Sequence, residues 1–124
     1  MSDWKDTTQA VADGIRRRVL EHVLKNNGGY MSQACSSAEM FAMLYSRTLN
    51  LGKSIAPLEP RRFHGVPGPG VPFMTGADYN GPKGPEYDRF IFSPAHYALV
   101  LYAALIEVGR LAERGLDHFN EDGS

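Results

Sequence analysis

Two short stretches hold residues whose types and positions could do chemistry, and the first is Ser93–His96. It follows the apolar run Phe90–Phe92 and precedes a helical pattern. Serine before a helix and proline at its first position are typical of a helix N-terminus, so we expect His96 in the first helical turn. Unpaired amides and the helix dipole attract phosphate groups at that place. His96 is therefore a candidate anion contact, and the alternative is a core histidine that bonds the backbone.

The second stretch is Asn27–Ser32, in which Gly28 and Gly29 precede Tyr30. Adjacent glycines let the backbone approach a ligand closely. A tyrosine hydroxyl can donate or accept a hydrogen bond, which makes Tyr30 a candidate ligand contact. The alternative is an ordinary turn between two helices, with Tyr30 packed as an anchor.

Other kinds of site lack their residues in this sequence. The four histidines are dispersed, and none pairs with the single cysteine, Cys35, or with a carboxylate at a recognised metal-ligand spacing. Neither a nucleophile-elbow sequence nor a phosphate-binding loop sequence occurs. We predict no catalytic residue and no metal ligand within the chain, and we expect Cys35 to be a small packing residue.

The composition limits what kind of protein must position these residues. The 124 residues include 13 Lys and Arg against 14 Asp and Glu, with 43% hydrophobic and 22% charged residues. These proportions argue against a disordered chain and against nucleic-acid binding through bulk positive charge. No apolar run is long enough to span a membrane, no signal-peptide pattern occurs, and one cysteine fits a reducing compartment. We expect a cytoplasmic protein whose partners include neither nucleic acid nor membrane.

Apolar periodicity predicts four helices, at about residues 4–26, 37–51, 94–108 and 112–119. In the first helix, apolar residues recur every four positions, and the Asn-Asn-Gly-Gly run that follows would end it. We expect the second to begin at Ser36, because Ser36–Glu39 has capping-box spacing.

The segments between these helices have a different character. The Phe-Ile-Phe run favours a short buried strand over residues 89–92. Residues 52–86 hold seven of the eight prolines, interleaved with aromatic and apolar residues. Because proline removes backbone donors, we predict a long Pro/Gly loop there that packs onto another surface.

The order of these features resembles the amino-terminal part of transketolase, a thiamine diphosphate enzyme. The most specific part is Tyr87–His96 followed by Leu101–Ala103. The family usually has Asp-Arg-Phe, two apolar residues, Ser, two small residues and His there. A first helix ending in Asn-x-Gly and a second ending in Leu-Tyr also match, and the resemblance runs from about Ala12 to Ser124.

The resemblance implies an α/β fold, the thiamine diphosphate-binding fold, for the complete enzyme. Residues 1–124 would be the amino-terminal part of its diphosphate-binding domain, mostly α-helical with one short strand. It also implies that His96 contacts thiamine diphosphate. Tyr30 stands where the family has a histidine that contacts the sugar substrate, so Tyr30 would be a substrate contact. Since a phenol is a poor proton relay near neutral pH, we expect altered substrate choice.

The family's Gly-Asp-Gly motif, which holds Mg²⁺ and the diphosphate, does not occur in this sequence. The resemblance therefore implies a subunit or fragment that is inactive alone. Its partners would supply the Mg²⁺ ligands, the rest of the diphosphate domain and the pyrimidine-binding domain. The assembly, a homo- or hetero-oligomer, would move a two-carbon ketol unit between sugar phosphates. The alternatives are a non-catalytic helical interaction module and another thiamine diphosphate synthase of the superfamily.

Overall fold

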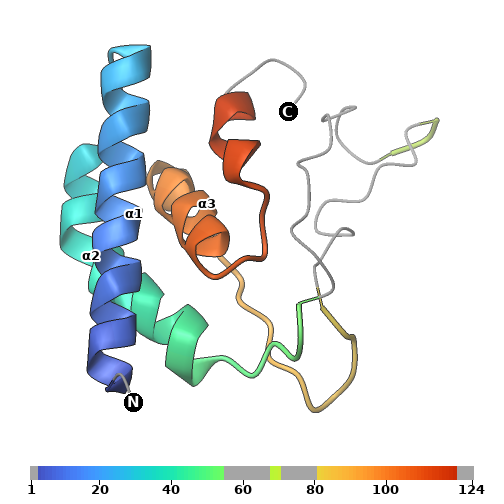
Figure 1. The fold of residues 1–124 in the computed structure, drawn as a ribbon. Helices are drawn as coiled ribbons and strands as arrows, with labels where there is room; N and C mark the ends of the chain where they lie inside the picture. The colour runs from blue at the N-terminus through green and yellow to red at the C-terminus, as the bar shows by residue number, and fades with distance from the viewer. Residues whose placement is uncertain (1–2, 55–67, 71–80, 120–124) are drawn as a thin grey trace.

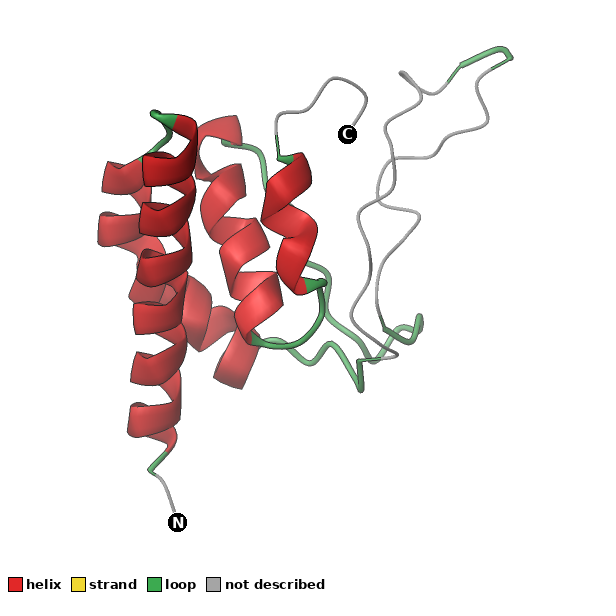
Figure 2. Cartoon of the chain, turned by 45° about the horizontal axis from the view of Figure 1, so that its top comes forward, coloured by secondary structure: helices red, strands yellow, loops and turns green. Residues whose placement is uncertain are grey.

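The structure is a computed structural model that describes residues 3–54, 68–70 and 81–119 (Figure 1). Three α-helices form its body: α1 (Trp4–Asn26), α2 (Met31–Met43) and α3 (Ala98–Glu107). Shorter helical turns flank them, namely a π-helical turn η1 (Leu44–Thr48) and the 3₁₀ helices η2 (Ala95–Tyr97) and η3 (Glu113–His118). The described part of the chain is helix and loop without a strand (Figure 2).

Helix α1 has the bounds that its sequence predicts. The Asp3 side chain caps its start by accepting a hydrogen bond from the amide of Lys5. Asn27 ends it in the left-handed conformation, with φ 51°, and the amide of Gly28 donates to the carbonyl of Val23. Asparagine and glycine are the residues that adopt such helix ends at least cost, so the local sequence sets this boundary.

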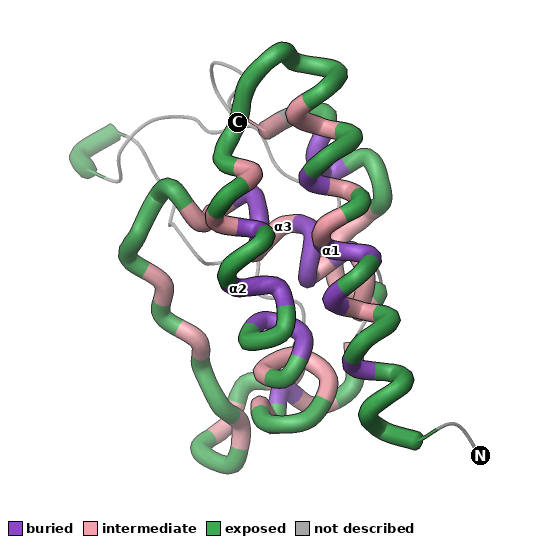
Figure 3. Tube along the Cα trace, turned by 90° about the vertical axis from the view of Figure 1, so that its left-hand side faces the viewer, coloured by how far each residue is buried: buried purple, intermediate pink, exposed green. Residues whose placement is uncertain are grey.

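The core lies where the three helices face one another. Helices α1 and α2 run side by side in opposite directions, and α3 packs against both (Figures 1 and 3). Many residues of this core are alanines, and their small side chains let the helix axes approach closely. The fully or almost fully buried apolar residues of the three helices are Ala12, Ile15, Val19, Ala34, Ala38, Phe41, Ala42, Leu99, Val100, Ala103, Ala104 and Ile106.

Helix α2 begins earlier than the capping-box pattern predicts. Its first residue is Met31, and no side chain caps it. The hydroxyls of Ser36 and Ser37 instead donate to the carbonyl of Gln33 within the helix, at 3.3 and 2.5 Å. The predicted start was wrong because serine hydroxyls can bond back to the preceding turn as readily as they cap a new one. Cys35 lies on the exposed side of α2, so it is not the packing residue we expected.

The third predicted helix starts in two stages. Residues Ala95–Tyr97 form the 3₁₀ turn η2, which continues directly into α3 at Ala98. Pro94 precedes this turn with extended backbone, at φ −73° and ψ 104°, and no side chain caps the turn. Ser93 is therefore not the helix cap. The predicted helix at 112–119 is the 3₁₀ helix η3, which is tighter and shorter than an α-helix of that span.

The predicted strand at 89–92 was wrong for the chain as described. Phe90 and Phe92 pack against Phe41 of α2, with ring centroids 5.9 and 5.5 Å apart, while Ile91 between them points away. No described segment lies alongside as a second strand. Of the predicted loop at 52–86, only 52–54, 68–70 and 81–86 are described, so its packing lies largely outside the described residues.

Ion pairs tie α1 to the carboxyl-terminal part of the fold. The guanidinium of Arg18 binds Glu107 at 2.5 Å and Glu113 at 3.3 Å. Burial, the largest single influence, lowers the pKa of Arg18, but the bonds to both carboxylates outweigh it and the pKa is raised. Gly14 leaves room for this contact, because a Cβ there would lie 2.3 Å from the Glu107 carboxyl group.

No helix in the described part of the chain is long and apolar enough to cross a membrane.

Candidate functional site

The turn between α1 and α2 presents Tyr30. Gly29 has φ +145°, and a Cβ at this position would lie 2.7 Å from Cγ2 of Val23, so the turn requires glycine here. Tyr30 follows as the residue before α2, and its side chain is exposed. The close reversal that the two glycines allow is therefore followed by a tyrosine that is 43% exposed.

His96 lies beside Tyr30. It is the middle residue of η2, which is closed by a hydrogen bond of 3.0 Å from the amide of Tyr97 to the carbonyl of Pro94. The two rings meet edge to face, with centroids 5.0 Å apart and planes at 89°. Both residues are exposed, so the histidine is not the core residue of the alternative interpretation. The fold thus brings together two residues that the sequence singled out in separate stretches.

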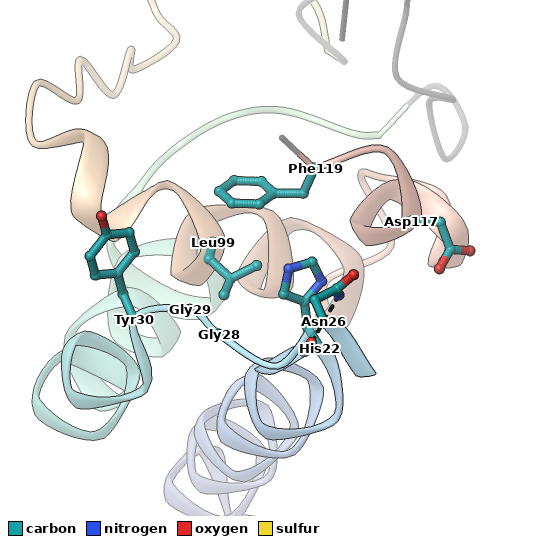
Figure 4. Close-up of a pocket in the computed structure, with 8 residues that line it drawn as sticks. All are labelled: His22, Asn26, Gly28, Gly29, Tyr30, Leu99, Asp117 and Phe119. Atoms are coloured by element: carbon teal, nitrogen blue, oxygen red, sulfur yellow. Dashed lines mark hydrogen bonds between the residues drawn. The ribbon is translucent and has the colours of Figure 1, made fainter. Parts of the chain in front are cut away.

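Tyr30 also lines a cavity of about 650 Å³, although His96 is not among the residues of its lining (Figure 4). Tyr30 forms one end of its lining, and Leu99 of α3 lies between Tyr30 and the opposite end (Figure 4). Its size suits a small-molecule ligand. The full lining is His22, Asn26, Gly28, Gly29, Tyr30, Leu99, Asp117 and Phe119.

The opposite end of the cavity is formed by the last turns of α1 and by the end of η3. His22 and Phe119 meet edge to face at 5.6 Å, and Lys25 Nζ binds the carboxylate of Asp117 at 2.9 Å. The side-chain amide of Asn26 donates to the carbonyl of His22 at 2.9 Å. Burial lowers the pKa of His22, the Lys25 charge lowers it further, and Asp117 opposes both. His22 is therefore held as a neutral imidazole at neutral pH.

Sequence reasoning did not select these residues of the opposite end. His22 and Asn26 are four positions apart at the end of α1 and therefore share one face of the helix. This spacing was the sequence pattern that could have pointed to them as neighbours in a site. Asp117 and Phe119 reach the cavity only because η3 folds back onto α1, and no local pattern marks that contact.

The described residues do not gather metal ligands. They include no group of three or more His, Cys, Asp or Glu side chains that could hold a metal ion. The site has an imidazole and a phenol that can bond to anionic or hydroxyl-bearing groups, together with a second, neutral imidazole at the far end of the cavity.

Comparison with known proteins finds relatives of one kind. Transketolase-like protein 2 of Mus musculus is 27% identical over 115 residues, and the alignment covers 93% of this chain but 14% of the mouse protein. The human protein of the same name is 26% identical over 105 residues, covering 85% of this chain and 13% of that protein. A transketolase family protein of Sinorhizobium fredii is 30% identical over 115 residues, covering 87% of this chain and 31% of that protein.

The chain thus spans less than a third of the length of each of these relatives. No protein-family profile matches it, and no solved structure matches it significantly. The names of all three matched proteins refer to transketolase. Their similarity over most of this chain supports its relation to the transketolase family.

Proposed function

We propose that this chain is part of a transketolase-like enzyme, which transfers a two-carbon ketol unit between sugar phosphates with thiamine diphosphate. The observation that carries the proposal is the ring contact between His96 and Tyr30, the latter of which lines a cavity of about 650 Å³. The family resemblance assigns these two residues to substrate and cofactor. Their contact supports a single site in which both roles operate together.

His96 is proposed as the cofactor contact. Its exposed imidazole can donate a hydrogen bond to an oxygen of the diphosphate, and the edge-on ring of Tyr30 holds its orientation. When bound, thiamine diphosphate supplies the electron sink for breaking and forming the carbon–carbon bond. The role of His96 is to bind and orient.

Tyr30 is proposed as the substrate contact. Its hydroxyl can donate to a sugar hydroxyl or phosphate oxygen, or accept from a sugar hydroxyl. A phenol in this place cannot shuttle a proton near neutral pH as a histidine can. The proposal therefore includes a substrate preference that differs from that of an enzyme with histidine at this position.

The donor set of this site fits an organic phosphate better than a metal ion. Mg²⁺ prefers carboxylate oxygens, phosphate oxygens and water, whereas the exposed pair here is an imidazole and a phenol. The one carboxylate in the cavity lining, Asp117, is bound to Lys25. We place the Mg²⁺ ligands outside this chain, in a partner that also carries the rest of the diphosphate domain and the pyrimidine-binding domain. The chain alone would be inactive.

Reconstitution tests the proposal. The chain is co-expressed with the polypeptide encoded next to it, and thiamine diphosphate-dependent ketol transfer from a phosphorylated ketose to an aldose is measured. We expect His96→Ala to abolish transfer or to weaken it together with cofactor affinity, and Tyr30→Phe to raise the KM for substrate. Met40→Ala, at an exposed residue of α2 that takes no part in the Tyr30–His96 ring contact, is the control and should behave as wild type. Full activity of the His96→Ala assembly would remove His96 from the site.

A further inference from the structure

The end of the cavity formed by α1 and η3 has the composition of a site for an uncharged polar molecule. Its walls combine the apolar side chains of Leu99 and Phe119 with the polar side chains of His22, Asn26 and Asp117. None of the described lining residues is a lysine or an arginine. Ligand pockets typically have mostly apolar walls and a few polar groups that fix the ligand. This end therefore suits a ligand that has both carbon–hydrogen surface and hydrogen-bonding groups.

His22 offers such a ligand a donor and an acceptor. Its ring meets Phe119 edge to face at 5.6 Å, and Phe119 in turn meets Tyr102 at 5.3 Å, so the imidazole is held by packing. Burial lowers the pKa of His22, which keeps the ring neutral, with one N–H and one bare nitrogen. No hydrogen bond from another described residue engages either ring nitrogen. Both nitrogens are therefore available to a ligand.

Asn26 lies one helical turn further along α1. Its side-chain NH₂ donates to the carbonyl of His22 at 2.9 Å, which holds the carboxamide beside the imidazole (Figure 4). The carboxamide then still has an oxygen that accepts and a second N–H that donates. A hydroxyl group also both donates and accepts. His22 and Asn26 together thus match the hydrogen-bonding needs of neighbouring hydroxyl groups.

A phosphate group fits this end of the cavity poorly. Among the described lining residues the one charged side chain is Asp117, a carboxylate, and the ammonium of Lys25 binds it at 2.9 Å. The charges of this pair cancel. His22 and Asn26 also lie at the carboxyl-terminal end of α1, where the helix dipole is negative and disfavours anions. A phosphate here would lose water without gaining a cation, and that loss is costly.

We propose that His22 and Asn26 form a specificity site that binds the hydroxyl-bearing carbons of a sugar and excludes its phosphate. The inference rests on the proposed function for a sugar as the natural ligand. The imidazole and the carboxamide exchange hydrogen bonds with the hydroxyls, while Leu99 and Phe119 pack against the carbon–hydrogen groups. A sugar phosphate accordingly binds with its phosphate outside this end of the cavity.

The test uses xylitol, an uncharged five-carbon polyol, titrated into the chain and followed by NMR. The imidazole resonances of His22, assigned by their loss in His22→Phe, should shift with a millimolar Kd, the range expected for so small a ligand. Asn26→Ala should weaken binding about two- to tenfold, which is what one neutral hydrogen bond contributes. Glu21→Ala, at an exposed residue of α1 outside the lining, is the matched control and should bind as wild type.

His22→Phe tests the imidazole nitrogens separately from packing, because it keeps an aromatic ring against Phe119. Xylitol binding to this variant, followed at the amide resonance of Gly29 in the lining, should weaken at least about twofold. Both variants should keep the helical circular dichroism of the wild-type chain. Unchanged xylitol affinity in His22→Phe and Asn26→Ala would overturn the specificity site.

Two further ligands test the chemistry of the site. Inorganic phosphate should leave the His22 resonances almost unmoved, and 1-pentanol, which has five carbons and one hydroxyl, should bind more weakly than xylitol. Equal binding of either one, or no shift with xylitol, would refute the specificity site. Xylitol binding that depends on His22 and Asn26, together with no ketol transfer on reconstitution, would refute the proposed function alone. Ketol transfer by a chain that does not bind xylitol would refute the specificity site alone.

Discussion

Replacing Gly14 by alanine should destabilise this chain, although alanine is the better residue inside a helix. In a helix interior, alanine is favoured over glycine by about 1 kcal/mol. At this position, however, the new Cβ would lie 2.3 Å from the carboxyl group of Glu107. That carboxylate is the end of a flexible side chain and can move, but moving it separates Glu107 from Arg18.

The size of the loss follows from the burial of that ion pair. The side chains of Arg18 and Glu107 are only 18% and 15% exposed, so solvent screens their interaction weakly. Hydrogen bonds to charged groups contribute about 1.5 to 3 kcal/mol. Subtracting the helix gain of about 1 kcal/mol leaves a net destabilisation of about 0.5 to 2 kcal/mol. For a chain of this length the corresponding drop in Tm is about 2 to 8 °C.

A double-mutant cycle separates the two contributions. Unfolding by urea is followed by circular dichroism for wild type, Gly14→Ala, Glu107→Ala and the double variant. When Glu107 is alanine, no carboxylate opposes the new Cβ, so Gly14→Ala should stabilise the chain by up to about 1 kcal/mol. The sign of the substitution should therefore reverse between the two backgrounds. A stabilising effect in wild type, or equal destabilisation in both backgrounds, would show that the contact does not constrain position 14.

Three further predictions concern the candidate site and its turn. The pKa of His22 is lowered in the folded state, so the free energy of unfolding should fall as pH drops below the ordinary histidine pKa of about 6.5. Urea titrations between pH 7.5 and 5.5 should show this fall, and a His22→Gln chain with the same pH dependence would contradict the prediction. Gly29→Ala should destabilise the chain by more than about 1 kcal/mol, because φ at Gly29 is positive and the new Cβ would lie close to Val23. Gly28→Ala should be nearly neutral, since its Cβ would meet nothing within 4 Å, and equal changes in Tm for the two variants would count against this turn geometry. In the reconstituted assembly, Tyr30→His should increase kcat/KM for sugar phosphates, and an unchanged substrate spectrum would argue that Tyr30 does not contact substrate.

The sequence predicts best the features that depend on neighbouring residues. The bounds of α1 agree because its apolar spacing and the Asn-Gly end are local signals. The start of α2 was missed because a serine run can serve as a cap or bond back within a helix, and the choice depends on where the chain has already turned. Tyr30 and His96 were identifiable from their local patterns, while the contact between them depends on how η2 packs beside the α1–α2 turn.

The misplaced strand has a different physical cause, and it is the more informative error. A helix satisfies its hydrogen bonds within its own backbone, so a correct pattern is enough to form it wherever its apolar face can pack. A strand is completed only by a neighbour, which its own sequence does not contain. Phe90–Phe92 carries the side chains of a buried strand and holds two of them against α2, yet it stays unpaired in the described chain. The strand pattern and the structure differ here because the described residues include no segment that could pair with Phe90–Phe92 as a second strand.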